Sequence, residues 1–224
     1  MGHRFYQFYT LRASVLSSAF KAKEIKSNPM KRVLLMSSLA LAIVMAGCVV
    51  TSIYPYYTSK DVTFNPALVG SWVENPGETN NTEVWTFAKA GEDAYKFTLT
   101  KSSETNEFSA HLFKLKDSLF IDFMPMEKHD DFIPPHYLMS VAQIQPTFKA
   151  SLMSYEWLGK LLEKDAHTIR YVMVPEESGN TNKQRFVLSA DTKELQKFVL
   201  KHLKTEGAFE KEIELQKLEA KSKP

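Results

Sequence analysis

The chain has 224 residues, with 28 basic and 26 acidic side chains and a net charge of +2. The near balance of the whole chain indicates no particular partner, but the part from Cys48 onward is mildly acidic and has no basic footprint, so nucleic acid is not expected as a partner. There is a single cysteine, Cys48, which excludes an internal disulfide and calls for another explanation in an exported chain.

An export signal is predicted over residues 30–47. Two basic residues, Lys31 and Arg32, precede an uncharged run over 33–45, and small residues follow it. A basic start, a short apolar run and small residues before a cut are typical of a secretory signal peptide. A membrane-spanning helix is the alternative, but the apolar stretch is marginal for a span of ~20 residues. Residues 1–29 are interpreted as a misassigned start, with translation from Met30; a disordered leader and a long basic extension of the signal are the alternatives.

The end of this signal, Met45-Ala46-Gly47-Cys48, resembles the lipobox of bacterial lipoproteins. The resemblance implies that Cys48 becomes the first residue and carries a diacylglycerol and an N-acyl chain, with no other cofactor. It also implies a cell-envelope protein held to a membrane by lipid. Val49 stands where an Asp would retain a lipoprotein in the inner membrane, which favours the outer membrane. Residues 1–47 hold seven of the basic side chains and one acidic one, so the mature chain has a net charge of −4.

A lipidated tether is predicted over 48–65 and a β-rich globular domain over 66–204. The first part of the domain has short segments with apolar residues at every second position, separated by turn residues, which is typical of half-buried antiparallel strands. We expect an up-and-down meander of five strands, over 68–74, 83–88, 95–100, 108–115 and 119–124.

The second part of the domain is predicted to mix strands and helices. Two strands are expected over 137–144 and 148–153, although the first could be helical. A hairpin is expected over 169–174 and 184–188. Ser154 and Asp191 are expected to cap a short helix over 154–164 and a C-terminal helix, the second with Glu194 in a capping box. Residues 205–224 are predicted to be a charged helical tail.

Gly70-Ser71-Trp72 on the first strand, after an export signal, resembles the first motif of lipocalins. The resemblance implies a lipocalin-like barrel or strongly curved sheet with a C-terminal helix, in which Arg185 would cover Trp72. It also implies a small apolar ligand held by inward aromatic side chains. The candidate ligand-binding residues are Trp72, Trp85, Phe97, Phe113 and Phe123.

No arrangement for catalysis or metal binding is predicted. His129, Asp130, Asp131 and His136 are suitable ligand types, but their spacing matches no metal site and a solvated loop explains them. Ser109, His111 and Asp122 could be drawn as a triad, but no nucleophile elbow accompanies them. The first hypothesis is a carrier of a small apolar ligand and the second an accessory that binds another envelope protein; an enzyme is the third, with no expected acid, base or nucleophile arrangement to support it.

Overall fold

The structure, a computed structural model, describes residues 49–77, 82–126, 133–175 and 184–219. The leader, the signal peptide and Cys48 lie outside these residues, and the interpretations made of them remain predictions.

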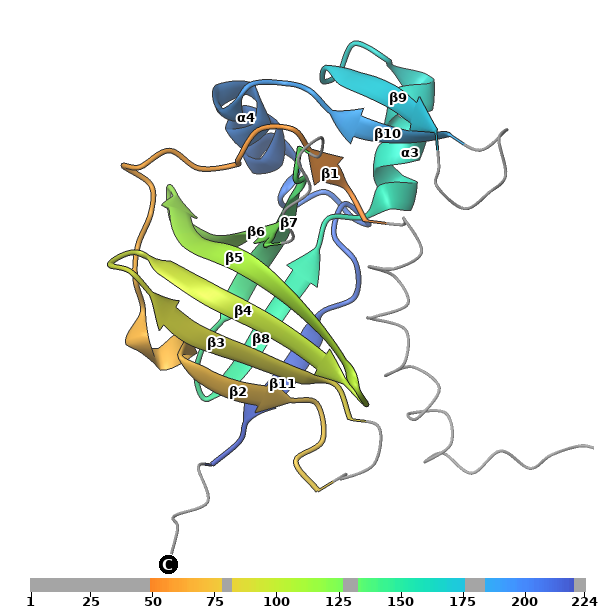
Figure 1. The fold of residues 1–224 in the computed structure, drawn as a ribbon. Coiled ribbons are helices and arrows are strands. Elements are labelled where there is room, and N and C mark those ends of the chain that lie inside the picture. Colours follow the sequence, from red (N-terminus) through yellow and green to blue (C-terminus); the bar gives the residue numbers. More distant parts are fainter. Residues whose placement is uncertain (1–48, 78–81, 127–132, 176–183, 220–224) are drawn as a thin grey trace, which may run out of the picture. The chain divides into compact units, whose positions relative to one another are not determined.

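Eight antiparallel strands form a closed barrel (Figure 1), which confirms the predicted lipocalin-like architecture. Seven strands follow chain order, and β6 pairs with β7 as well as with β5. They are β2 (Gly70–Val73), β3 (Val84–Ala90), β4 (Ala94–Lys101), β5 (Glu104–Leu115), β6 (Ser118–Pro125), β7 (His136–Gln143) and β8 (Thr147–Leu152). The eighth strand, β11 (Ile213–Lys217), pairs with both β8 and β2 and closes the barrel.

Side-chain alternation places the barrel core as the sequence predicts. On β4, Tyr95, Phe97 and Leu99 are buried inside, while the residues between them are partly exposed. On β6, Ile121 and Phe123 join the same interior cluster, while Asp122 faces outward. Because successive strand residues point to opposite faces, one apolar residue in two is enough to fill the barrel.

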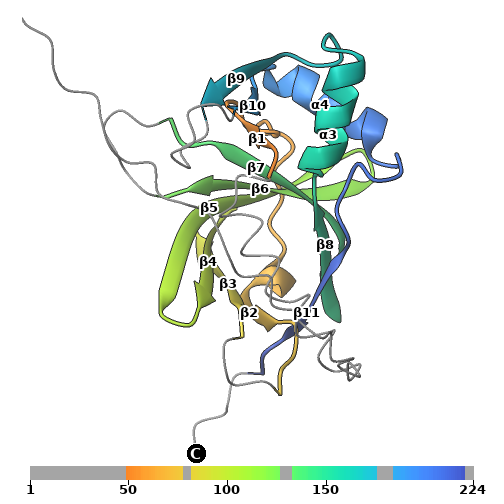
Figure 2. The same ribbon diagram turned by 90° about the vertical axis from the view of Figure 1, so that its right-hand side faces the viewer.

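A second layer, called here the outer layer, covers one side of the barrel. It consists of a small sheet and two helices: β1 (Thr51–Ser52), β10 (Gln184–Leu188), β9 (Tyr171–Pro175), α3 (Tyr155–Lys164) and α4 (Thr192–His202). Figure 2 shows the helices and the small sheet together above the barrel strands. β1 joins the layers, because it pairs with β7 on one side and β10 on the other.

Both helices begin where the sequence predicts. The Ser154 side chain accepts a hydrogen bond from the N–H of Trp157, and the Asp191 side chain accepts one from the N–H of Glu194. Each cap satisfies a backbone donor that the first helical turn leaves free. The apolar faces of the helices, with Leu158 and Leu162 on α3 and Leu195 and Phe198 on α4, join the apolar cluster of the outer layer.

One end of the barrel, called here the closed end, is covered by residues 64–68. These include a short 3₁₀ helix, η1 (Pro66–Leu68), whose Leu68 is fully buried in the interior cluster. The backbone N–H of Asn65 donates to the Tyr95 hydroxyl at 2.7 Å, and the Trp72 indole N–H donates to the carbonyl of Leu68 at 2.9 Å. These hydrogen bonds tie the segment to β2 and β4.

The residue that covers Trp72 is Lys217, not Arg185 as predicted. The Lys217 ammonium lies 5.2 Å from the ring centroid of Trp72 and donates to the carbonyl of Ala67 at 3.0 Å. Arg185 lies on β10, opposite Val174 in the small sheet, because β10 is not a barrel strand. The last strand of the barrel is β11, and its Lys217 lies over Trp72, where the lipocalin resemblance predicted Arg185.

Two further predictions are wrong. The segment over 213–217, expected as part of a helical tail, is the strand β11, so the domain extends beyond 204. Hydrogen bonding to two barrel edges outweighs the helix preference of its Glu and Lys residues. The expected tether over 48–65 does not hold the domain at a distance in its described part: Val49 to Ser52 are buried against the domain, Thr51–Ser52 form the strand β1, and Tyr56 is fully covered.

Gly70 is expected to be sensitive to substitution because of its backbone and its neighbour. Its φ is +133°, and an added Cβ would lie 2.7 Å from Cε of Lys217. Gly70→Ala should therefore lower the free energy of unfolding by about 1–3 kcal/mol in urea titrations. Gly77→Ala, which would meet nothing within 4 Å, is the matched control. A loss no larger than that of the control would contradict this account of the closed end.

Candidate functional site

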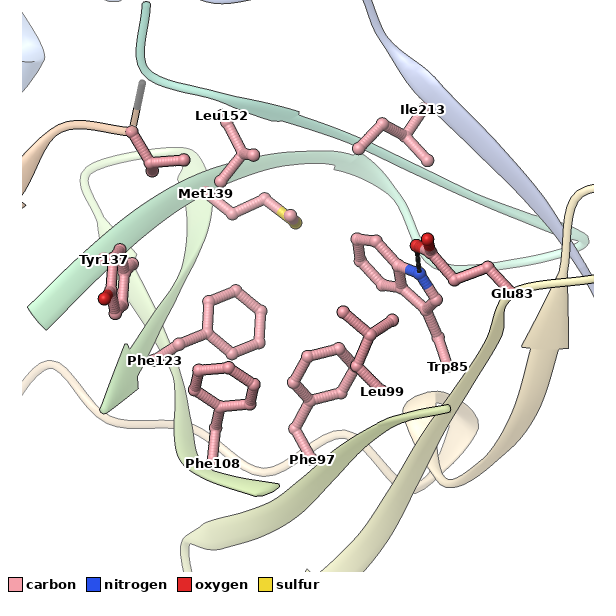
Figure 3. A pocket seen from close by; sticks show the side chains of 11 residues that line it. Glu83, Trp85, Phe97, Leu99, Phe108, Phe123, Tyr137, Met139, Leu152 and Ile213 are labelled. Atoms are coloured by element: carbon pink, nitrogen blue, oxygen red, sulfur yellow. Dashed lines mark hydrogen bonds between the residues drawn. The ribbon is translucent and has the colours of Figure 1, made fainter. Parts of the chain in front are cut away.

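An apolar pocket opens at the end of the barrel opposite residues 64–68, called here the open end. Seven of the eight barrel strands contribute to its wall, as does the segment before β1. Figure 3 shows the side chains facing a common space. The aromatic wall consists of Trp85, Phe97, Phe108, Phe123 and Tyr137, and the aliphatic wall of Val49, Leu99, Met139, Leu152 and Ile213.

The pocket is small because aromatic rings fill most of the barrel. Its volume is about 40 Å³. The rings of Phe97 and Phe123 lie 4.9 Å apart between centroids, and Trp85 meets Phe97 edge to face at 5.3 Å. A water-sized group needs ~10–15 Å³ by this measure, so the pocket has room for roughly three such groups.

Glu83 is the one charged residue in this wall, and only one of its two carboxyl oxygens has a hydrogen-bond partner among the described residues. Oε1 accepts a hydrogen bond from the Trp85 indole N–H at 2.7 Å. Oε2 is buried and has no hydrogen-bond partner among the described residues. Burial raises the pKa of the Glu83 carboxyl, although the hydrogen bond from Trp85 acts in the opposite direction. A buried, unpaired carboxyl oxygen is costly, so it favours a ligand that carries a hydrogen-bond donor.

The predicted ligand-binding residues fall in three places. Trp85, Phe97 and Phe123 line the pocket. Trp72 is also inside the barrel, but at the closed end. Phe113 lies outside the barrel, stacked on Phe120 in the outer-layer cluster, because its strand β5 turns that face toward the outer layer.

Sequence reasoning missed several wall residues. Phe108 and Tyr137 lie on strands that were predicted, and their aromatic character was an available signal. Val49 and Ile213 lie on segments that were predicted as tether and helix, so no pattern placed them in the barrel.

A polar cluster lies on the outer face of the barrel, where the N-terminal segment crosses it. Asp122 is 1% exposed; its carboxylate accepts from the backbone N–H of Tyr56 at 2.9 Å and from Nδ1 of His136 at 2.7 Å. His111, directly opposite Asp122 on β5, shares a hydrogen bond of 2.9 Å with the Tyr57 hydroxyl. Burial lowers the pKa of His111, although the nearby Asp122 acts in the opposite direction. The cluster fastens residues 56 and 57 to the barrel.

These contacts give His111 and Asp122 a structural explanation. Both carboxylate oxygens of Asp122 are engaged by other partners, and the ring of His111 stacks on Tyr57 at 4.6 Å. Among the described residues, no three His, Cys, Asp or Glu side chains gather as a metal site. His129, Asp130 and Asp131 lie outside the described residues.

In the parts of the chain that the structure describes, no helix has the length and apolar content needed to cross a bilayer. Comparisons with protein-family models, with curated proteins and with solved structures find no match. The pocket and its surroundings are therefore the basis for a functional proposal.

Removal of the Asp122 side chain should destabilise the fold. Asp122→Ala would leave the Tyr56 N–H and the His136 ring without their buried acceptor, at about 1–3 kcal/mol for each group. We expect the free energy of unfolding to fall by about 2–6 kcal/mol in urea titrations. Asp117→Ala, on the exposed turn between β5 and β6, should change it by less than about 0.5 kcal/mol. Similar values for the two variants would show that the cluster does not fasten the segment.

Proposed function

We propose that this protein is a lipid-anchored protein of the bacterial cell envelope whose barrel binds a slender apolar ligand at its open end. The observation that carries the proposal is a wall that is apolar except for Glu83, in a barrel that is covered at the other end. Small-ligand sites are mostly apolar with a few placed polar groups, and they typically enclose ~300–1,000 Å³, so this pocket of about 40 Å³ would hold only one end of a ligand. The lipobox over 45–48 supports the anchor, and Val49 after Cys48 favours the outer membrane.

The pocket volume restricts the kind of ligand. Room for roughly three methylene-sized groups suits the end of a hydrocarbon chain better than a ring system. At ~0.8 kcal/mol for each buried methylene, three of them contribute about 2–3 kcal/mol, which corresponds to a dissociation constant on the order of 10 mM. Such weak binding suits a ligand that is locally concentrated, as chains are in a membrane.

Glu83 suggests the chemistry of the ligand's polar end. An ammonium or hydroxyl group can donate to the free Oε2 oxygen, whereas a carboxylate would meet a like charge when Glu83 is ionised. The proposed ligand is therefore an alkyl chain that ends in a donor group.

The filled interior supports a second candidate, an accessory that binds another envelope protein. The structure shows about 40 Å³ of space rather than a large cavity. Solvent-exposed apolar side chains on the edge strand β9, Val172 (42%) and Met173 (50%), are a possible contact for such a partner. An exposed strand edge can accept a strand from another chain.

Fluorescence quenching at Trp85 tests the carrier proposal. A chain that starts at residue 49 is titrated with a bromoalkanol and with a bromoalkanoate of equal length, because bromine quenches an indole that it contacts. We expect quenching at millimolar bromoalkanol and weaker quenching by the carboxylate. The Trp85→Phe variant should lose this response, since Trp72 and Trp157 lie outside the pocket.

Two variants test the mode of binding. Ile213→Phe fills the pocket from β11 and should abolish the quenching. Glu83→Gln should remove the preference for the alkanol over the alkanoate. If the Trp85 signal is unaffected by bromoalkanol at ~10–50 mM, a range that spans the expected dissociation constant, or if Ile213→Phe responds like the unmodified chain, the accessory hypothesis is favoured.

A further inference from the structure

We propose that the open end of the barrel is the face that lies on the membrane, so that the pocket opens toward the bilayer. This inference rests on the proposed lipidation of Cys48 and adds the partner surface and the route of the ligand. The partner is the phospholipid bilayer itself.

The first argument is the position of Val49. This residue is 5% exposed, forms part of the pocket wall and pairs with Ser154, the N-cap of α3. Consecutive Cα atoms are ~3.8 Å apart, so Cys48 is one residue from the pocket wall. The residue that would carry the lipid is therefore the sequence neighbour of a wall residue, and acyl chains attached to it would start close to the open end.

The second argument is a pair of exposed apolar side chains at the same rim. Met126 directly follows β6 and is 46% exposed, and Ile133 precedes β7 and is 74% exposed. Both strands contribute to the pocket wall near these ends, through Phe123 and Tyr137. Exposed apolar side chains at a rim favour contact with an apolar partner, and the interface of a bilayer provides one.

Electrostatic attraction to the membrane does not account for the proposed contact. From Cys48 onward the chain has a net charge of −4, which offers no general attraction to anionic headgroups. The anchor therefore holds the protein to the membrane, and the rim sets its orientation. A hydrocarbon chain can then pass between bilayer and pocket without crossing water, which suits the weak binding that the pocket volume allows.

Site-specific labels test this orientation. Cys48 is the chain's only cysteine, so a cysteine introduced elsewhere can be labelled uniquely once Cys48 carries lipid. Ile133→Cys places an environment-sensitive fluorophore at the open end, and Glu92→Cys places one on the exposed turn between β3 and β4, at the other end. Met173→Cys reports on the outer layer. The lipidated full chain is reconstituted in phosphatidylethanolamine–phosphatidylglycerol vesicles with spin-labelled lipid tails.

We expect the label at position 133 to be quenched by the lipid tails at least threefold more strongly than the label at position 92, and to be shielded from aqueous iodide. The label at position 173 should behave like that at position 92. Equal accessibility of all three labels to iodide, or quenching strongest at position 173, would overturn the inference. Either result would leave the Trp85 titration unaffected, because that experiment uses a chain without lipid.

Discussion

The barrel depends on its closure by β11, a strand that follows the outer layer in the chain but lies between β8 and β2 in the sheet. Its last residue, Lys217, lies over Trp72 and reaches the carbonyl of Ala67, so one residue ties the first strand, the last strand and η1 together. The φ of +133° at position 70 requires glycine, and the lysine side chain lies where an added Cβ would be. Because this end is filled, the remaining space of the barrel lies at the other end.

The parts of the fold that sequence predicts well are those with local causes. The alternation of Tyr95, Phe97 and Leu99 with polar residues requires a strand with one buried face, and the structure contains it. Asp191 and Ser154 mark helix starts because a capping side chain acts within three residues of its own position. The same alternation put Trp85, Phe97 and Phe123 inside the barrel, where they line the pocket.

The wrong predictions concern residues whose structure is determined by segments far away in the sequence. Residues 213–217 have the composition of a solvated helix, and only their pairing with strands more than 60 residues earlier makes them a strand. The prediction that Arg185 covers Trp72 is wrong because it requires β10 to be the last barrel strand, whereas β10 pairs with β9 in the small sheet. Phe113 is buried by the outer layer, which no local pattern reveals. Ile213 was not predicted as a wall residue because its segment was expected to be helical.

The two ends of the barrel thus have different roles in this account. The closed end provides stability, and the open end brings together an apolar wall, the unpaired oxygen of Glu83 and the residue next to the proposed lipid. The lipid is the central claim, because both the local supply of ligand and the orientation at the membrane follow from it. Intact mass spectrometry of the chain extracted from its native membrane tests that claim most directly. The account predicts a chain that starts at Cys48 and carries a diacylglycerol and an acyl chain. A chain that retains residues 30–47 and has no added lipid mass would contradict it.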